Sequence, residues 1–429
     1  MGFAGKRFSQ EERRSPRPQV SAIRCRIEDE TMSIYQQLGV QPIINACGTV
    51  TRLGGAPMPA EVLDAFAQAA VESVPLEHLQ AAASRRIAEV TGADAGLVTC
   101  GAAGALTLGT SAILTGHNLA RIEKLPCCDG FPHELIIARE QRSGYDHAVR
   151  AAGANLVEVG FNEIVSNAGV RRTEVWEYEA AITSQTVGIV YVHAHDSCPN
   201  LQEVVAMAHE HDLPVLVDAA GELPPRSNLK DIPATGADLV CFSGGKAIHG
   251  PQSTGILCGR GGLISSAALQ MLDMDDHLDL WDPPENLIDR SQLTGIPRHG
   301  IGRGLKVSKE EIVALLTALD LFASGEFDSQ LLEYRRMLST VADSLSGAKV
   351  NCRMLEPLTQ DCWPVLEITV DCSALGVSAM DVCRALRTGT PPVYVGHAGL
   401  HEGRLQINPV CLQEAALPSL TRRLMDELS

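Results

Sequence analysis

Short apolar runs rich in Val, Ile and Leu alternate with alanine-rich helical stretches between residues 95 and 260. Runs that are apolar throughout are typical of strands buried on both faces. Because these runs alternate with helical stretches, they predict a mainly parallel α/β sheet with helices on both sides. The predicted strands are AGLVTC (95–100), HELIIAR (133–139), ANLVEVG (154–160), VGIVYVHA (187–194), LPVLVDAA (213–220), ADLVCFS (237–243) and TGILCG (254–259).

The pattern changes near residue 305. The segment SKEEIVALLTALDLF opens with the capping-box residues Ser308 and Glu311, which predict the start of a helix. The later apolar segments predict a smaller C-terminal α+β domain. They are the strands VLEITVD (365–371) and RLQINPV (404–410) and the helix AMDVCRALR (379–387).

The chain therefore divides into four predicted parts. Residues 1–31 are charged and contain two prolines, so we expect a disordered N-terminal extension, and Met32 is a candidate native start. The other parts are an N-terminal arm (32–75), a large domain (76–305) and a small C-terminal domain (306–429).

Charge and composition exclude several classes of partner. Lys and Arg total 35 against 52 Asp and Glu, a net charge of −17, so the chain repels polyanions and we expect no nucleic-acid partner. No apolar stretch reaches the ~18 residues of a membrane span, and no signal-peptide core is present, so we expect a cytoplasmic protein without membrane contact. Thirteen cysteines without paired CxxC motifs agree with a reducing compartment. His193 and His195 lack a third ligand of fitting context, so we expect no metal.

Lys246 stands where a surface lysine is not expected. It follows the apolar run 239–242 and the turn 243–245, so its amine is expected inside a cleft. Desolvation disfavours the charged ammonium, and a neutral lysine amine can form a Schiff base with a carbonyl. Pyridoxal 5′-phosphate (PLP) is the cofactor that this chemistry suggests. A lysine that caps a turn or pairs with a carboxylate is the alternative.

Two further features favour PLP. Asp218 ends a strand, where a carboxylate could keep a pyridine nitrogen protonated and make the ring an electron sink, although it could instead cap a turn. Backbone N–H groups of small residues at a helix N-terminus can close around a phosphate, although such residues can also serve helix packing. The small residues that follow an early strand and open a helix are Gly101, Ala102, Ala103 and Gly104.

A glycine-rich loop, a strand-end aspartate and a lysine after the next strand, in this order, resemble the fold type I PLP enzymes. The chain further resembles the selenocysteine synthase (L-seryl-tRNA(Sec) selenium transferase) family, and is closest in character to its D-glucosaminate-6-phosphate ammonia-lyase-type members. The resemblance covers roughly residues 33–410. Its matching segments are INACGTVTRLGGAPMP (44–59), GANLVEVG (153–160), TGADLVCFSGGKAIHGPQSTGILCGR (235–260) and GRGLKVSKEEIVALLTAL (302–319).

The resemblance implies an aspartate aminotransferase-like fold, with a large PLP-binding domain and a small C-terminal domain. It implies that Lys246 forms the Schiff base, that Asp218 pairs with the pyridinium, and that Ser243 joins the Gly101 loop in binding the phosphate. It also implies a homodimer or a dimer-based oligomer, because fold type I sites usually lie between subunits.

Further cofactor contacts are implied less specifically. The loop VHAHDSCPN places His195, with His193 and Asp196, near where related enzymes contact the cofactor's 3-hydroxyl. A flat side chain often stacks on the outer face of the ring, and the sequence does not choose among the candidates. These candidates are Gln141, Arg142, Tyr145 and His147.

Two departures from the family bear on the substrate. The chain reads GGAP at 54–57, where selenocysteine synthases carry GRAP, so an arginine suited to an anion is missing. Those enzymes also have an N-terminal tRNA domain, whereas only about thirty disordered-looking residues precede the matching region. Together with the −17 charge, these departures favour a small amino acid over a charged tRNA as the substrate.

Basic residues offer candidate sites for the substrate's anionic groups. Related enzymes often bind the substrate α-carboxylate with an arginine at the position that Gln406 occupies here. Arg404 is two residues away on the same strand face and could take over this role, or it could be an ordinary surface arginine. The segment IPRHGIGRGLK suggests an anion site that could be reached across a dimer interface, or else a helix lead-in with solvated charges. Its basic residues are Arg298, His299, Arg303 and Lys306.

Together with the resemblance to the ammonia-lyase-type members, these residues predict a PLP-dependent lyase that acts on a small hydroxylated amino acid. Lys246 would remove the α-proton, the β-hydroxyl would leave, and hydrolysis would give a keto acid and ammonia. A phosphorylated sugar amino acid is one candidate substrate. Aldol cleavage, transamination and β-replacement share the first steps and remain alternatives, as do a selenium transferase acting on seryl-tRNA and a non-catalytic PLP-binding protein.

Overall fold

The computed structural model describes residues 32–161, 172–357 and 359–429. Its contacts divide the chain into two compact units, Met1–Pro42 and Ile43–Ser429. The described part of the first unit contains the helix α1 (Ile34–Gln37). The predicted N-terminal extension, residues 1–31, lies outside the described residues, and the other predicted domain boundaries stay predictions.

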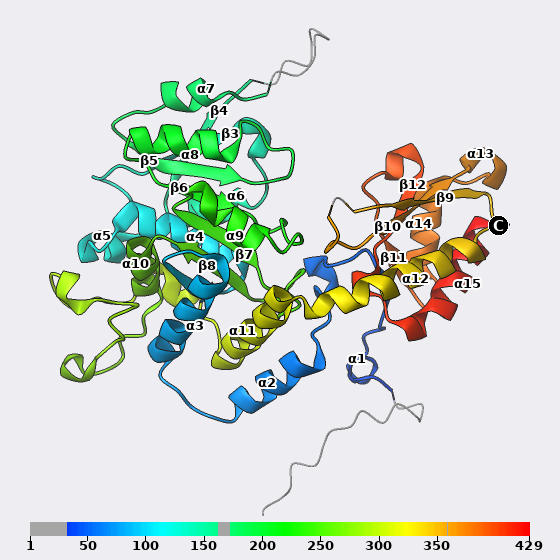
Figure 1. Ribbon diagram of the computed structural model, residues 1–429, viewed down its shortest axis with the longest axis horizontal. Helices are drawn as coiled ribbons and strands as arrows, with labels where there is room; N and C mark the ends of the chain where they lie inside the picture. The colour runs from blue at the N-terminus through cyan, green and yellow to red at the C-terminus, as the bar shows by residue number, and fades with distance from the viewer. Residues whose placement is uncertain (1–31, 162–171, 358) are drawn as a thin grey trace, which may run out of the picture. The chain divides into compact units, whose positions relative to one another are not determined.

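The largest sheet of the second unit follows the order β2-β8-β7-β6-β5-β3-β4 (Figure 1). Strands β7, β6, β5, β3 and β4 run parallel, whereas β8 is antiparallel to both of its neighbours. Each apolar run that was predicted as a strand forms one, so the mainly parallel sheet is confirmed. The strands are β2 (Ala95–Thr99), β3 (Glu134–Ala138), β4 (Asn155–Val159), β5 (Thr186–Val192), β6 (Val215–Asp218), β7 (Leu239–Ser243) and β8 (Gly255–Gly259).

Both faces of this sheet are buried, because alternate side chains of each strand enter different cores. Val215 and Val217 of β6 pack in the core that contains α3, α8 and α11, while Leu216 packs in the core that contains α4 and α10. Helices therefore cover both faces. The helices of this unit up to residue 324 are α2 (Ala60–Ala70), α3 (Leu76–Thr91), α4 (Gly101–Thr115), α5 (Leu119–Lys124), α6 (Asp146–Ala151), α7 (Val175–Ala180), α8 (Leu201–Glu210), α9 (Asn228–Asp231), α10 (Gly261–Met271) and α11 (Lys309–Ser324).

Helix α11 begins as its sequence predicts. The Ser308 hydroxyl accepts a hydrogen bond from the backbone N–H of Glu311, and the Glu311 carboxylate accepts one from the Ser308 N–H. Ile312, Leu315 and Leu319 of this helix are buried and belong to the core of the large sheet. Helix α11 therefore packs against the large sheet.

The C-terminal region is built on two small sheets. Strands β12-β10-β9 are antiparallel, and β1 pairs in parallel with β11. Both sheets share one apolar core with α12, α14 and α15. The elements are β1 (Ile44–Ala46), β9 (Val350–Leu355), β10 (Val365–Val370), β11 (Val393–Val395), β12 (Arg404–Ile407), α12 (Ser329–Ser344), α13 (Cys372–Leu375), α14 (Ala379–Thr388) and α15 (Leu417–Leu428). The predicted α+β character of this region is confirmed.

Candidate active site

A cavity of about 770 Å³ lies beyond the carboxyl ends of β5, β6 and β7. His193 and His195 follow β5, Glu222 follows β6, and Lys246 follows β7. The remaining wall comes from the loop after β1, the segment that precedes β10, and Asn408 after β12. The position matches the rule that open α/β sheets bind ligands beyond the carboxyl ends of their strands. We call this space the Lys246 cavity.

The turn that carries Lys246 leaves no room for larger residues. A Cβ atom on Gly245 would lie 2.4 Å from the Cα of Gln252, so a glycine is required there. The Gly244 N–H donates to the Thr254 carbonyl at 2.9 Å and fixes the turn. Lys246 itself is partly buried and, among the described residues, makes no ion pair. The turn therefore presents an amine without a carboxylate partner to the cavity.

Asp218 ends β6 beside the cavity. Its Oδ1 accepts a hydrogen bond from the Ala220 N–H at 3.0 Å, and its carbonyl accepts one from the His193 N–H at 2.9 Å. Burial raises the pKa of the Asp218 carboxyl, and the Ala220 N–H and the charge of Lys246 partly oppose this rise. A cationic partner would therefore stabilise its ionised form.

The residues predicted to hold a phosphate lie together. Ser243 is the register partner of Gly255 across β7 and β8. A Cβ atom on Gly255 would lie 2.4 Å from the carbonyl carbon of Gly101 and 2.6 Å from the Ala102 nitrogen. Gly101 adopts a φ of 72°, which favours glycine, at the start of α4. Because Gly255 contacts Gly101 and Ala102 on one side and pairs with Ser243 on the other, Ser243 lies close to the N-terminus of α4.

Two buried polar atoms near the end of β5 lack partners within the described parts of the chain. Gln141 accepts a hydrogen bond from the Val192 N–H at 3.0 Å, but its Nε2 has no acceptor. The Nδ1 of His193 is likewise unpaired, and burial lowers the pKa of this histidine. Buried polar groups without partners are rare in folded proteins and often indicate a missing ligand.

The remaining residues that were predicted to contact the cofactor differ in their surroundings. Arg142 forms ion pairs with Asp146 and Glu158. Tyr145 and His147 are exposed. The side chain that stacks on the cofactor ring therefore stays a prediction. His195 lines the Lys246 cavity and is exposed, as is Asp196 beside it.

The basic segment 298–306 lines no part of the Lys246 cavity within one chain. Arg298 forms an ion pair with Glu123 at 3.1 Å, and Arg303 forms one with Asp273 at 2.5 Å. Lys306 lines a different cavity of about 250 Å³ together with Asp273. Carboxylates of the same chain therefore balance much of this segment's charge, and its predicted role in substrate binding stays a prediction.

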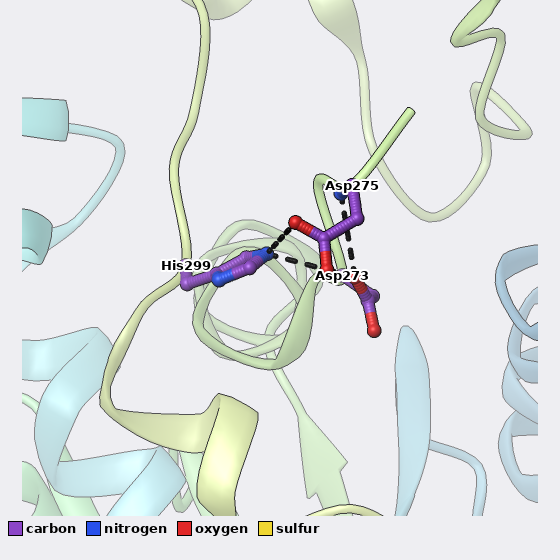
Figure 2. A group of neighbouring side chains, drawn as sticks. All are labelled: Asp273, Asp275 and His299. Atoms are coloured by element: carbon purple, nitrogen blue, oxygen red, sulfur yellow. Dashed lines mark hydrogen bonds and ion pairs between the residues drawn. The ribbon is translucent and has the colours of Figure 1, made fainter. Parts of the chain in front are cut away.

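His299 belongs to a small acidic group. Its Nε2 lies 3.6 Å from Asp273 and 3.8 Å from Asp275, and Figure 2 shows the three side chains pointing toward one another. Their potential ligand atoms lie within 4.8 Å of one another, as in a metal site. All three are exposed, Arg303 already pairs with Asp273, and His299 Nε2 accepts a hydrogen bond from the Met274 N–H at 2.9 Å. The expectation that no metal is bound stays a prediction.

Arg404, the predicted carboxylate ligand, is already paired. It lies 3.6 Å from Glu367 on the neighbouring strand and forms an ion pair with Glu402. It is not among the residues that line the Lys246 cavity. Its predicted role therefore stays a prediction, and it would require Arg404 to leave these carboxylates.

Sequence reasoning missed several residues of the cavity wall, among them Cys47, Glu222, Trp363 and Asn408. Glu222 follows Asp218 closely in the sequence VDAAGE, so its distance from the strand end was a usable signal. Cys47 follows β1, and its thiol donates a hydrogen bond to the Val395 carbonyl at 2.9 Å. No local pattern reveals this residue, because the contact joins distant parts of the chain.

The strand order, the two-sided helix cover and the lysine turn beyond β7 define the class of protein, a fold type I architecture of the aspartate aminotransferase kind. Residues 144–275 match the family SelA, L-seryl-tRNA selenium transferase. The 5′-C-glycyluridine monooxygenase-decarboxylase of a Streptomyces species is 30% identical over 92% of this chain and 92% of its own length. The D-glucosaminate-6-phosphate ammonia lyase of Salmonella typhimurium is 28% identical over 92% of this chain and 98% of its own. A solved D-glucosaminate-6-phosphate ammonia-lyase superposes with a TM-score of 0.75 at 27% identity, covering 92% of this chain and 98% of that chain.

The chain belongs to the selenocysteine synthase-like family of fold type I PLP-dependent enzymes. The predicted family and fold class are thereby confirmed. The residues around the cavity fit PLP chemically, because they offer a lysine amine, a strand-end carboxylate, a glycine-lined helix N-terminus and unpaired polar atoms. Within the described residues, no helix has the length and apolar character needed to cross a bilayer.

Proposed function

We propose that this protein is a PLP-dependent lyase that converts a small β-hydroxy amino acid into a keto acid and ammonia. The observation that carries the proposal is the position of Asp218 and Lys246 at the carboxyl ends of the adjacent strands β6 and β7. The relatives support the reaction type, since an ammonia lyase aligns over 92% of this chain in sequence and in structure. A substrate that also carries a phosphate, as in that relative's name, is one candidate.

Each residue has a distinct proposed task. Lys246 would hold PLP covalently, and Asp218 would accept a hydrogen bond from the ring nitrogen and keep it protonated. Ser243 and the N–H groups at the start of α4 would bind the phosphate. The unpaired Gln141 Nε2 and His193 Nδ1 lie near the end of β5, where His195 also approaches the cavity. The bound cofactor supplies an electron sink for the pair left by the α-proton.

The chemistry at the substrate would then fall to the chain's own groups. Once the substrate amine has displaced Lys246, the free Nζ would take the α-proton. The Cβ–O bond would break with loss of water, and hydrolysis would return the water and release ammonium. Overall, a β-hydroxy amino acid becomes a keto acid and an ammonium ion with atoms balanced.

Purified protein supplied with PLP provides the test. It would be incubated with D- and L-forms of serine, threonine and glucosaminate 6-phosphate, without any keto-acid acceptor. Equal amounts of ammonia and keto acid are expected from at least one of them, because elimination returns the cofactor to its starting form. Turnover that needs an added acceptor, or that yields glycine and an aldehyde, would contradict the proposal and leave the cofactor assignment intact.

A second candidate is favoured by the relative of 30% identity, whose name describes an oxygen-dependent decarboxylation. Loss of CO₂ from an amino acid uses the same lysine and the same electron sink. Oxygen uptake and CO₂ release measured on the same substrates, together with glycine-bearing nucleosides, would separate the two reactions. A selenium transferase is less favoured by the −17 charge, and a gel shift with seryl-tRNA tests it.

Assembly into a homodimer is part of the proposal. Fold type I sites usually lie between subunits, and the basic segment 298–306 would then face a neighbouring chain's cavity. Light scattering gives the mass of the assembly. A monomer with full lyase activity would remove this role for the segment.

A further inference from the structure

Glu222 is the acidic side chain in the wall of the Lys246 cavity. Its backbone is fixed on both sides, since the Glu222 N–H donates to the Ala219 carbonyl at 3.1 Å and Asn228 Nδ2 donates to the Glu222 carbonyl at 2.7 Å. This turn leads directly from Asp218 and β6. The side chain is therefore held at the cavity by the same strand end that carries Asp218.

The Glu222 carboxyl has no assigned structural task. It is partly buried, and within the described residues no hydrogen bond or ion pair reaches its oxygens. Arg298 and Arg303 of segment 298–306 differ in this respect, because each forms an ion pair with a carboxylate elsewhere in the same chain. An acid held at a cavity without a partner has its proton available for a ligand.

We propose that Glu222 is the general acid that protonates the leaving β-hydroxyl, an inference that rests on the lyase function proposed above. Hydroxide is a poor leaving group, so the Cβ–O bond breaks readily only if the oxygen gains a proton as the bond opens. The electron pair of that bond goes to the oxygen, the Glu222 proton joins it, and water departs. Lys246 takes the α-proton in the same elimination, so separate groups supply and accept protons.

The electrostatic surroundings agree with this task. Burial raises the pKa of the Glu222 carboxyl, while the charges of His195 and Lys246 oppose the rise and Asp218 and Asp196 add to it. A raised pKa keeps a larger share of the carboxyl protonated toward neutral pH. The other titratable side chains that line the cavity are His193, Cys47 and Cys362.

A change of leaving group separates an acid from a structural residue. Chloride needs no proton to depart, so β-chloroalanine should be eliminated without a general acid, whereas serine of the same configuration requires one. Glu222→Gln should lower kcat/KM for the hydroxy substrate by about 10²- to 10⁴-fold and change that for β-chloroalanine by less than about threefold. Glu222→Asp should retain more activity on the hydroxy substrate than Glu222→Gln. The exposed Glu210→Gln on α8 is the matched control and should leave both rates unchanged.

Each result has a distinct meaning. Equal losses for both substrates in a folded Glu222→Gln protein, or no loss on the hydroxy substrate, would overturn the role of Glu222 and leave the lyase function standing. A wild-type protein that eliminates chloride but no β-hydroxyl would overturn both the role of Glu222 and the proposed β-hydroxy substrate, and would leave the cofactor assignment intact. A wild type that releases no ammonia from either class would overturn the lyase function itself, and the acid role with it.

The pH dependence gives an independent readout. With the hydroxy substrate, kcat should fall as pH rises through the pKa of Glu222, because only the protonated carboxyl can donate. This limb should be absent with β-chloroalanine and absent in Glu222→Gln. If the limb persists in the variant, another group is the acid and the proposal fails.

Discussion

The Lys246 cavity and the basic segment 298–306 differ in whether their charged side chains have ion-pair partners. In the cavity, Lys246 and Glu222 lie partly buried without ion-pair partners among the described residues. In the segment, Arg298 and Arg303 each pair with a carboxylate of the same chain. Pairing satisfies a charge within the fold, whereas an unpaired charge at a cavity stays available to a ligand. The partners of a charged residue thus indicate its role better than its sequence neighbours do.

The largest expected effect belongs to Lys246→Ala. Borohydride reduction in the presence of PLP should label Lys246 in the wild type, because its unpaired amine faces the cavity, and should label no residue in the variant. Peptide mass spectrometry identifies the labelled lysine, and ammonia release should fall below detection. Lys306→Ala is the matched control, since Lys306 lines the other cavity and should not affect the label. A label that maps to Lys306 would show that the cofactor binds at the basic segment and not in the Lys246 cavity.

Asp218→Asn should give the next largest effect. A charge-assisted hydrogen bond contributes ~1.5–3 kcal/mol, so losing it should slow turnover by roughly ten- to a hundredfold. Cofactor affinity, measured by fluorescence titration, should fall less than kcat, because Lys246 and the residues proposed to bind the phosphate remain. A larger loss of affinity than of turnover would make Asp218 a binding residue only.

Arg303 and Asp273 test whether a paired charge can still serve a substrate. If the segment binds the substrate's distant anion across a subunit interface, Arg303→Ala should raise KM for glucosaminate 6-phosphate by about tenfold. Asp273→Ala should lower the same KM, because it frees the guanidinium. The borohydride label on Lys246 should be unchanged in both. If neither KM moves while the melting temperature of both variants drops, the pair is purely structural.

The smallest effect concerns two histidines whose pKa values burial lowers, His193 in the cavity wall and His249 in the core. His249 is 6% exposed and its Nδ1 lies 2.9 Å from the Pro57 carbonyl. Its folded-state pKa is below the unfolded value of about 6.5, so the stability from the neutral ring is complete above that pH and is lost as pH falls toward the folded pKa. His249→Asn, which suits the φ of 60°, should flatten this loss of stability in urea unfolding as pH falls below about 6.5. An unchanged pH profile would show that His249 is not the responsible group.

The features that could be predicted from the sequence are those that depend on a local pattern of residues. The strands of the large sheet were predictable because most are continuous apolar runs. Asp218 was predictable because it follows such a run directly, and Lys246 because it follows one after a short glycine turn. Strands β1 and β11 were not predicted, because each has three residues and exists only through the pairing with the other.

The pairing of charges was equally invisible in the sequence. Arg298 meets Glu123, which lies 175 residues away, and Arg303 meets Asp273, 30 residues away. Glu222 was overlooked although it stands only four residues after Asp218, because VDAAGE has the composition of an ordinary turn and the fold is needed to show that this turn opens onto the Lys246 cavity. These ion pairs and the exposure of Glu222 to the cavity depend on tertiary contacts, which local sequence patterns do not reveal.

The parallel pairing of β1 with β11 also affects the order in which the protein folds during synthesis. The hydrogen bond from Cys47 to Val395 joins groups 348 residues apart. At translation rates of ~5–20 residues per second, the ribosome needs on the order of 20–70 s to deliver the second partner after the first. The large sheet can form within that interval, whereas the cavity wall at Cys47 and Asn408 cannot. The nascent chain therefore carries the Lys246 cavity open to water until translation is nearly finished, and a ribosome stalled before β11 would hold a large sheet whose cavity wall cannot be completed.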